Sequence, residues 1–262
     1  MTDHAALLGL DPAGGYGAPD PGLLAAVRGT WQDDPAREPV LPAGTTVRAL
    51  LPVLIALVPE SLDRFASFGI GADVAAESLS DVGRKVRVYG AGADTPWLAG
   101  LLRADVVALG RLQVGRVPEA GGHALHVPEL GPLDPAAVDR SLARAAAWCG
   151  TDAFTCHSWL LDDLLPRVLD PGSNILRFAS RFTVVDGGTR PAPGGPATTA
   201  DHMVARFVFR RPLDEVLDAG APAPAPDGVL RRFVAEHLRA GGHWTEPLGA
   251  LTLPGAAGHR RA

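Results

Sequence analysis

The spacing of hydrophobic residues changes near residue 110, and this change constrains the fold more than any other feature of the chain. Before it, apolar residues recur at helical spacing over long stretches. After it, short β-compatible runs are separated by turn-rich segments and by further helical runs. The sequence therefore predicts a mostly helical N-terminal part of about 105 residues, followed by an α/β layer with a mixed sheet.

Local signals place the individual elements. Three helices are expected before residue 110, at 20–31, 52–68 and 95–112, the last with Thr95 as N-cap and Pro96 at its first position. After residue 110 the pattern predicts strands at 110–117, 123–129, 152–161, 173–185, 202–211 and 247–254. It predicts helices at 131–150, 162–169 and 229–242, a loop at 186–201 and an extended connector at 219–228.

Composition excludes several classes of protein. The net charge is −5 with no block of like charges, so the chain lacks the basic footprint of a DNA-binding protein. The N-terminus has no basic signal region and the longest apolar run, 49–59, is too short to cross a bilayer. The two cysteines belong to no metal-ligand array, so no metal is expected. We therefore expect a cytoplasmic protein, and its abundant Ala, Gly and Pro indicate a bacterial source.

Six stretches carry a resemblance to a known family. They are "ESLSDVGRKVRVYG", "ALGRLQ", "LHVPELGPLDPAAVDRSLARA", "TCHSWLLD", "SNILRFASRF" and "LRAGGHW". In this order they resemble the bacterial acyltransferase-domain proteins that pair a helical N-terminal acyltransferase domain with a GNAT-like C-terminal domain. The resemblance implies an α/β (α+β) fold, in which a helical domain at 1–105 packs on a GNAT-like mixed sheet with flanking helices at 106–254. A disordered tail is expected at 255–262.

The resemblance also implies an activity. GNAT-like proteins transfer an acyl group from a thioester, acyl-CoA or a carrier-bound acyl group, to an amine, here one on a small-molecule acceptor. Coenzyme A or acyl-CoA is the expected co-substrate and an acyl carrier protein a conceivable partner. The GNAT pyrophosphate signature Gln/Arg-x-x-Gly-x-Gly/Ala is missing, and "PELGPLDPAAV" stands in its place. Two alternatives therefore stay open: a donor such as aminoacyl-tRNA or a carrier protein, and a non-catalytic module that binds a small anion.

The first candidate site is "LHVPELG". His126 points away from the face of Leu125 and Val127, and Pro128 removes a backbone donor, so the strand is expected to open there. His126 and Glu129 are the leading candidates for the base that deprotonates the amine. Backbone groups near Val127, Leu130, Gly131 and Leu133 are candidates for holding the CoA pyrophosphate at the following helix N-terminus. The alternative is a strand end with a solvated acid and a hydrogen-bonded histidine.

The second candidate site is "TCHSWLL". Strand alternation puts Cys156 and Ser158 on one face and His157 and Trp159 on the other, so these neighbours cannot act as one Cys-His-Ser unit. In a GNAT-like sheet this strand would lie beside "LHVPE", with the thioester where the two separate. Ser158 or Cys156 could protonate the leaving thiolate and His157 could contact the acceptor. The alternative is a core cysteine and a structural histidine.

The remaining candidates would bind substrate. They are Arg111 and Gln113, Arg177 and Arg181, His243 and Trp244, and Trp159. Arg177 and Arg181 are four residues apart, which would place them on one strand face, where they could bind an anion or pair with Glu and Asp from the helical domain. His243 and Trp244 follow two glycines and could wall a pocket, or Trp244 could pin the last helix to the sheet.

Overall fold

The computed structural model describes residues 3–35, 37–218 and 228–254, and these form two compact units. The first unit contains residues 1–130 and 141–149, and the second contains 131–140 and 150–262. The predicted connector, apart from Gly228, and the predicted tail lie outside the described residues. The chain is α/β, as expected, while our division of it at residue 105 stays a prediction.

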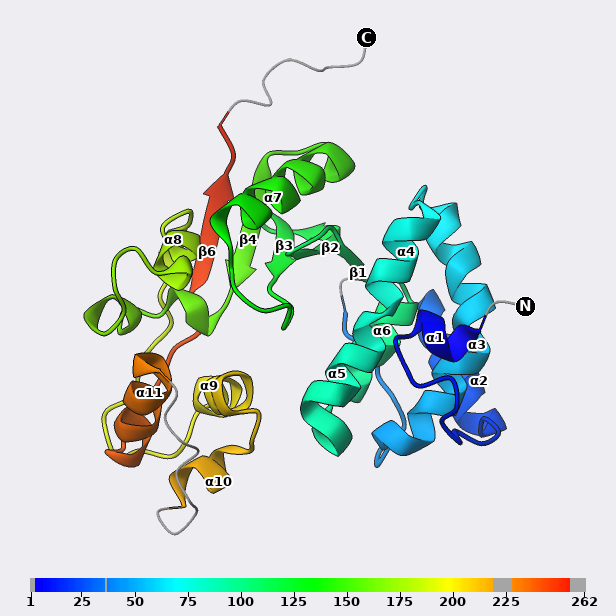
Figure 1. Ribbon diagram of the computed structural model, residues 1–262, viewed down its shortest axis with the longest axis horizontal. Coiled ribbons are helices and arrows are strands. Elements are labelled where there is room, and N and C mark those ends of the chain that lie inside the picture. The colour runs from blue at the N-terminus through cyan, green and yellow to red at the C-terminus, as the bar shows by residue number, and fades with distance from the viewer. Residues whose placement is uncertain (1–2, 36, 219–227, 255–262) are drawn as a thin grey trace. The chain divides into compact units, whose positions relative to one another are not determined.

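Helices dominate the first unit (Figure 1). They are α1 (His4–Leu7), α2 (Pro21–Gly29), α3 (Val47–Ser67), α4 (Ala72–Leu79), α5 (Asp81–Tyr89) and α6 (Thr95–Leu102), with short 3-10 turns at Thr30–Gln32 and Gly90–Gly92. Helix α3 is central, because it packs against α1, α2, α4 and α6. One of its faces is fully buried, with Leu50, Leu54 and Leu57 at zero exposure. Ser61 Oγ of α3 donates a 2.7 Å hydrogen bond to the carbonyl of Leu102, which ties α3 to the end of α6.

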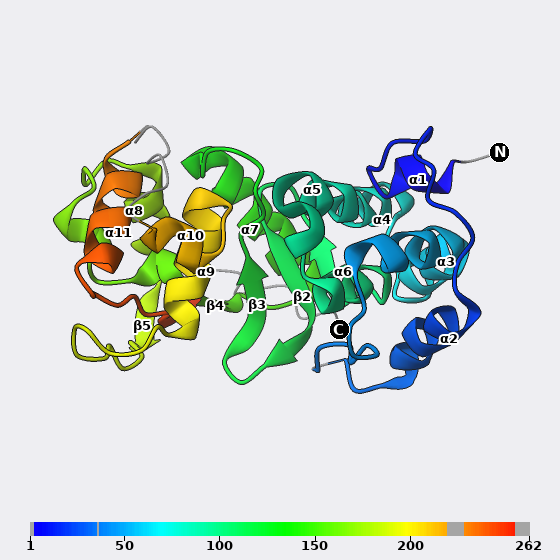
Figure 2. The same cartoon turned by 90° about the horizontal axis from the view of Figure 1, so that it is seen from below.

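The first unit also holds three antiparallel strands, β1 (Val106–Ala108), β2 (Gln113–Glu119) and β3 (Gly122–His126). Figure 2 shows β2 and β3 as a hairpin. Its turn is made by Gly121 and Gly122, whose φ angles of +100° and +133° suit only glycine well. The register sets Gln113 opposite His126 and Val114 opposite Leu125. Helices α4 and α6 contact β1, so the N-terminal helices pack on this part of the sheet.

The helix predicted at 95–112 is too long. Helix α6 ends at Leu102, after which Ala104 takes a φ of +60° and the β-branched pair Val106 and Val107 enters β1. Pairing with β2 is a tertiary contact that local helical spacing does not reveal. The N-cap is Asp94 rather than Thr95, since the Asp94 carboxylate accepts the N–H of Trp97 at 3.1 Å.

The second unit combines three strands with short helices. Its strands are β4 (Ala153–His157), β5 (Thr183–Asp186) and β6 (Leu248–Thr252), and β6 pairs antiparallel with both others. Its helices are α8 (Asn174–Ala179), α9 (Thr199–Phe209), α10 (Leu213–Leu217) and α11 (Val229–Arg239), with 3-10 turns at Trp159–Leu161 and Leu165–Arg167. Helix α7 (Pro135–Cys149) begins in the second unit and ends in the first.

Two predicted strands are wrong. The segment 173–185 forms α8, capped by Ser173, before the short strand β5, and 202–211 lies mostly in α9. Helix α9 begins with a capping box, in which Thr198 and Asp201 bond each other's backbone N–H. Its buried residues Ala200, Val204 and Val208 recur every four positions. The segment is also rich in valine and phenylalanine, which favour a strand, and only the packing shows that the helical spacing governs.

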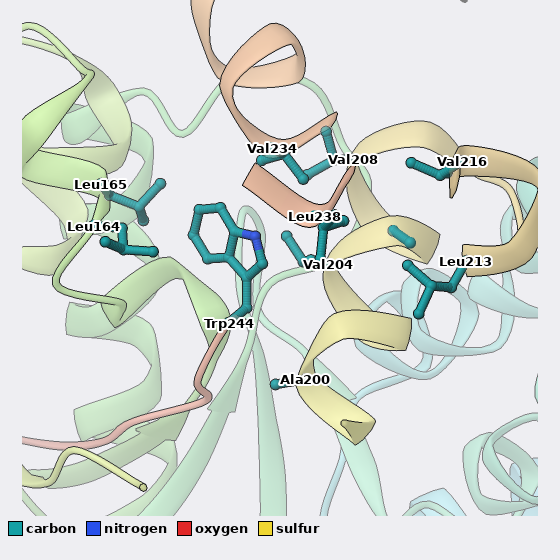
Figure 3. Packing of buried hydrophobic residues seen from close by; sticks show 11 residues of the cluster. Leu164, Leu165, Ala200, Val204, Val208, Leu213, Val216, Val234, Leu238 and Trp244 are labelled. Atoms are coloured by element: carbon teal, nitrogen blue, oxygen red, sulfur yellow. The ribbon is translucent and has the colours of Figure 1, made fainter. Parts of the chain in front are cut away.

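The hydrophobic core of the second unit surrounds Trp244, which is 1% exposed (Figure 3). Side chains from α9 and α11 and from the turns after β4 lie near its indole, and those of α10 extend the cluster beyond α9. Those labelled in Figure 3 are Leu164, Leu165, Ala200, Val204, Val208, Leu213, Val216, Val234 and Leu238. Trp244 lies just before β6, so this core fixes the segment that leads into the strand.

Candidate active site

A cavity of about 160 Å³ lies in the first unit and reaches the end of β3. Residues 35 and 37–39, the start of α6 and one face of β1–β3 line it, and its polar lining includes Arg37, Glu38, Asp105, Glu119 and His126. The Trp97 ring meets the His126 ring edge-on, with centroids 5.0 Å apart. His126 is therefore a wall of a cavity rather than a sealed core residue.

His126 is uncharged at neutral pH. Burial lowers the pKa of its imidazole and the charge of Lys85 lowers it further, from the ordinary 6.5 to about 4. A neutral imidazole has a lone pair that can accept a hydrogen bond or a proton. The low pKa makes His126 a weak base, so its contribution depends on positioning the amine as well as on taking its proton.

Glu129 is held by two partners from α5. Lys85 Nζ donates to both of its carboxylate oxygens, at 3.0 and 2.8 Å, and the Tyr89 hydroxyl donates to Oε1. Burial alone would raise the pKa of Glu129, but Lys85 and Tyr89 outweigh this and the pKa lies below its ordinary value. An ion-paired carboxylate of lowered pKa is a poor proton acceptor. The geometry favours Glu129 as an anchor of the segment after β3, and its role as base stays a prediction.

Arg111 and Gln113 also join this polar layer. Gln113 is 1% exposed, and its amide donates to Asp81 at 2.8 Å, the carboxylate that also accepts from Arg84. Arg111 Nη1 donates to the carbonyl of Pro128 at 3.0 Å, next to Glu129. These contacts favour a supporting role for both side chains beneath the end of β3, and their contact with substrate stays a prediction.

The segment from Val127 to Leu133, predicted to hold the pyrophosphate, is only partly exposed. Val127 is partly buried, Leu130 is exposed, Leu133 is buried and Gly131 has a φ of +79° with open space beside it. Helix α7 starts as predicted, with the Asp134 carboxylate accepting the N–H of Ala137 at 2.8 Å. Because Pro135 has no N–H and Asp134 occupies that of Ala137, two of the first three helical amides do not serve a phosphate. Pyrophosphate binding here stays a prediction.

The candidate residues at the end of β4 lie in different surroundings. Cys156 is buried, and burial raises the pKa of its thiol to about 12, so it remains protonated and unreactive. Ser158 Oγ accepts the N–H of Leu160 at 3.1 Å and so caps the following 3-10 turn. His157 is exposed at the strand end, and the Trp159 ring packs edge-on against Trp244. Of these residues, the geometry favours His157 for contact with a substrate.

Arg177 and Arg181 do not lie on a strand. Arg177 belongs to α8 and Arg181 follows it, so the predicted strand face for the two is wrong. Arg181 Nη2 forms a 2.7 Å ion pair with Asp139 of α7 and donates to the carbonyl of Pro135. Arg181 thus takes an acidic partner, but from α7 and not from the N-terminal helical domain as expected, and anion binding by this pair stays a prediction.

His243 and Trp244 are both buried, at 4% and 1% exposure. His243 Nδ1 lies 2.8 Å from Asp201 Oδ2, and the backbone N–H of Trp244 donates to the other Asp201 oxygen. Next along the chain, Thr245 donates twice to the buried carboxylate of Asp162. This network favours the reading in which these residues hold α9, α11 and the entry of β6 together.

Sequence reasoning missed several residues of these sites. The Lys85–Glu129 pair, the Trp97–His126 contact and the Asp162–Arg190 ion pair join residues 28 to 44 positions apart, and no local pattern reports them. Asp201 could have been found, because Thr198-x-x-Asp201 has capping-box spacing. In the part of the chain that the structure describes, no three His, Cys, Asp or Glu side chains gather as a metal site would require. Over the same residues, no helix combines the length and apolarity needed to span a membrane.

Comparison with known proteins identifies the chain as a GNAT-like acyltransferase. Residues 106–251 match the family model described as the GNAT-like C-terminal domain, which is more than half of the chain, so the chain belongs to that family. No curated protein sequence matches it significantly.

Solved structures similar to this chain are acyltransferases. One is in complex with decanoyl-CoA and teicoplanin and another with CoA and 10C-teicoplanin; each is 30% identical at a TM-score of 0.72. A third, a tryptophan-to-alanine variant in complex with octanoyl-CoA, is 31% identical at a TM-score of 0.71. In each case the match covers 90% of this chain and 81% of the other.

Proposed function

We propose that this protein is an N-acyltransferase that moves an acyl group from acyl-CoA to an amine on a small-molecule acceptor. The observation that carries the proposal is the match along 90% of the chain to acyltransferases in complex with CoA or acyl-CoA and with teicoplanin. The cavity beside His126 supports it, because it offers space next to an uncharged imidazole at a strand end.

The cavity lining suits an amine attached to a ring system. Trp97 and the prolines at 35, 39 and 96 provide flat apolar walls. The lining holds the carboxyl groups of Glu38, Glu119 and Asp105, the last paired with Arg103, and one positive charge, that of Arg37. The excess of carboxyl groups would attract a cationic amine before it loses its proton.

The transfer needs one bond made and one broken. The amine nitrogen attacks the thioester carbonyl carbon, and the C–N bond forms as the C–S bond breaks with its electron pair left on sulfur. The amine gives up a proton, and the thiolate takes one, so that an amide and CoA–SH are the products. We assign His126 two roles. It accepts a hydrogen bond from the amine, which orients the nitrogen lone pair toward the carbonyl carbon, and it takes the proton that the nitrogen releases once the C–N bond has formed.

The test is acceptor-dependent release of CoA, followed with a thiol reagent. Decanoyl-CoA is the donor and teicoplanin the acceptor, and the wild type is compared with His126→Gln and with the surface control Glu215→Gln on α10. We expect the wild type and the control to release CoA only when the acceptor is present, and His126→Gln to be slower by ~10²-fold. Equal rates in His126→Gln would remove this histidine from the mechanism. Release independent of acceptor would indicate a thioesterase, and no release would argue against acyl-CoA as donor.

A further inference from the structure

A carboxylate that the mechanism above does not use lies on the same sheet face as His157. Strands β4 and β6 pair antiparallel with His157 opposite Leu248, and the Ser158 N–H donates to the Pro247 carbonyl at 3.1 Å one step further on. From Thr245 to Leu251, buried and partly buried residues alternate strictly, so the pleat continues beyond the formal start of β6. Glu246 and Leu248 therefore share the face of His157.

Register makes Glu246 the diagonal cross-strand neighbour of His157. Such neighbours are close enough for long side chains to interact. The two residues also differ in exposure: His157 is exposed and Glu246 is partly buried. Burial raises the pKa of Glu246 and the charge of His157 offsets part of this rise, in keeping with the diagonal position that the register gives the two residues.

We propose that His157 is the general acid that protonates the departing CoA thiolate, and that Glu246 is the positioning residue that orients its imidazole. This inference rests on the proposed function, because it concerns the leaving group of the same reaction. A neighbouring carboxylate favours the charged form of an imidazole. The exposure of His157 allows it to regain a proton from water after each turnover.

The step balances without a further reactant. As the C–S bond breaks, its electron pair stays on sulfur and the His157 imidazolium transfers its proton there, giving CoA–SH and a neutral imidazole. Glu246 stays ionised throughout and gains or loses nothing.

Leaving-group dependence tests the proposal. His157→Gln, Glu246→Gln, Glu246→Asp and the control Glu215→Gln are each assayed with decanoyl-CoA and with S-decanoyl-thionitrobenzoate, whose thiolate is stable without protonation. With decanoyl-CoA we expect kcat to fall ~10²-fold in His157→Gln and by a smaller factor in Glu246→Gln, with KM nearly unchanged and partial rescue in Glu246→Asp. The double variant should be no slower than His157→Gln alone.

With the thionitrobenzoate donor we expect the variants and the wild type to transfer at similar rates. Equal losses with both donors would overturn the proposal, since a merely structural role would not depend on the leaving group. Unchanged kcat in Glu246→Gln with decanoyl-CoA would remove Glu246 from it. A wild type inactive with decanoyl-CoA would instead refute the proposed function, so the two failures are distinguishable.

Discussion

Acid sensitivity of folding offers a quantitative check on His126. The pKa of its imidazole is about 4 in the folded protein against an ordinary 6.5. As the pH falls below 6.5 the unfolded chain takes up this proton, whereas the folded protein takes it up only near pH 4. Stability that is fully present above pH 6.5 is therefore lost as the pH falls toward 4, at about 1.4 kcal/mol per unit. Over the whole window this amounts to about 3 kcal/mol.

The perturbation is His126→Gln, which keeps a polar side chain of similar length and cannot take up a proton. Urea unfolding followed by far-UV circular dichroism gives the free energy of unfolding at several pH values between 7 and 4.5. We expect the difference between the wild type and the variant to change with pH, the wild type losing more stability on acidification. His202→Gln, an exposed histidine on α9, serves as control and should parallel the wild type. Parallel curves for the wild type and His126→Gln would refute the burial and charge argument for this side chain.

Three further predictions concern the support of the site. Lys85→Met leaves the Glu129 carboxylate without its ion-pair partner, so the free energy of unfolding, measured by thermal unfolding, should fall by ~3 kcal/mol. The double variant with Glu129→Gln should regain most of this stability. An unchanged stability in Lys85→Met would contradict the anchor role of the pair. Because burial raises the pKa of the Cys156 thiol to about 12, this cysteine should resist a thiol reagent at pH 8 until urea unfolds the protein. The variant Cys156→Ala should keep the wild-type transfer rate. A Cys156→Ala variant that folds but is inactive would point to a covalent intermediate. Gly83→Ala should lower the free energy of unfolding by ~3 kcal/mol, because the new Cβ would lie 2.1 Å from the Gly9 carbonyl oxygen. A melting temperature equal to that of the wild type would show that the backbone moves apart at little cost.

Elements with complete local signals could be predicted from the sequence. Helix α7 has an Asp134 cap, Pro135 at its first position and Gly150 with a φ of +67° after its end, and β6 is a short apolar run between prolines. Segments whose composition fits two structures could not. Residues 202–209 were expected as a strand, because their burial against Trp244 is what selects the helix.

Some residues of the candidate site could be predicted from local patterns and others could not. His126 could be placed at a strand end from alternation and the following Pro128, and the structure adds a cavity beside it. Glu246 could not be found, because it gains its meaning only from the register between β4 and β6, which joins residues about 90 positions apart. The cytoplasmic location and bacterial origin stay predictions from composition alone.

Transfer of the acyl group to nitrogen is the central claim, and the mass of the product tests it most directly. The protein is incubated with decanoyl-CoA and teicoplanin, and the acceptor is analysed by mass spectrometry before and after treatment with hydroxylamine, which cleaves esters and spares amides. We predict one decanoyl group added to the acceptor for each CoA released, and a product that survives hydroxylamine. An unmodified acceptor beside free decanoate, or a product that hydroxylamine cleaves, would contradict the account.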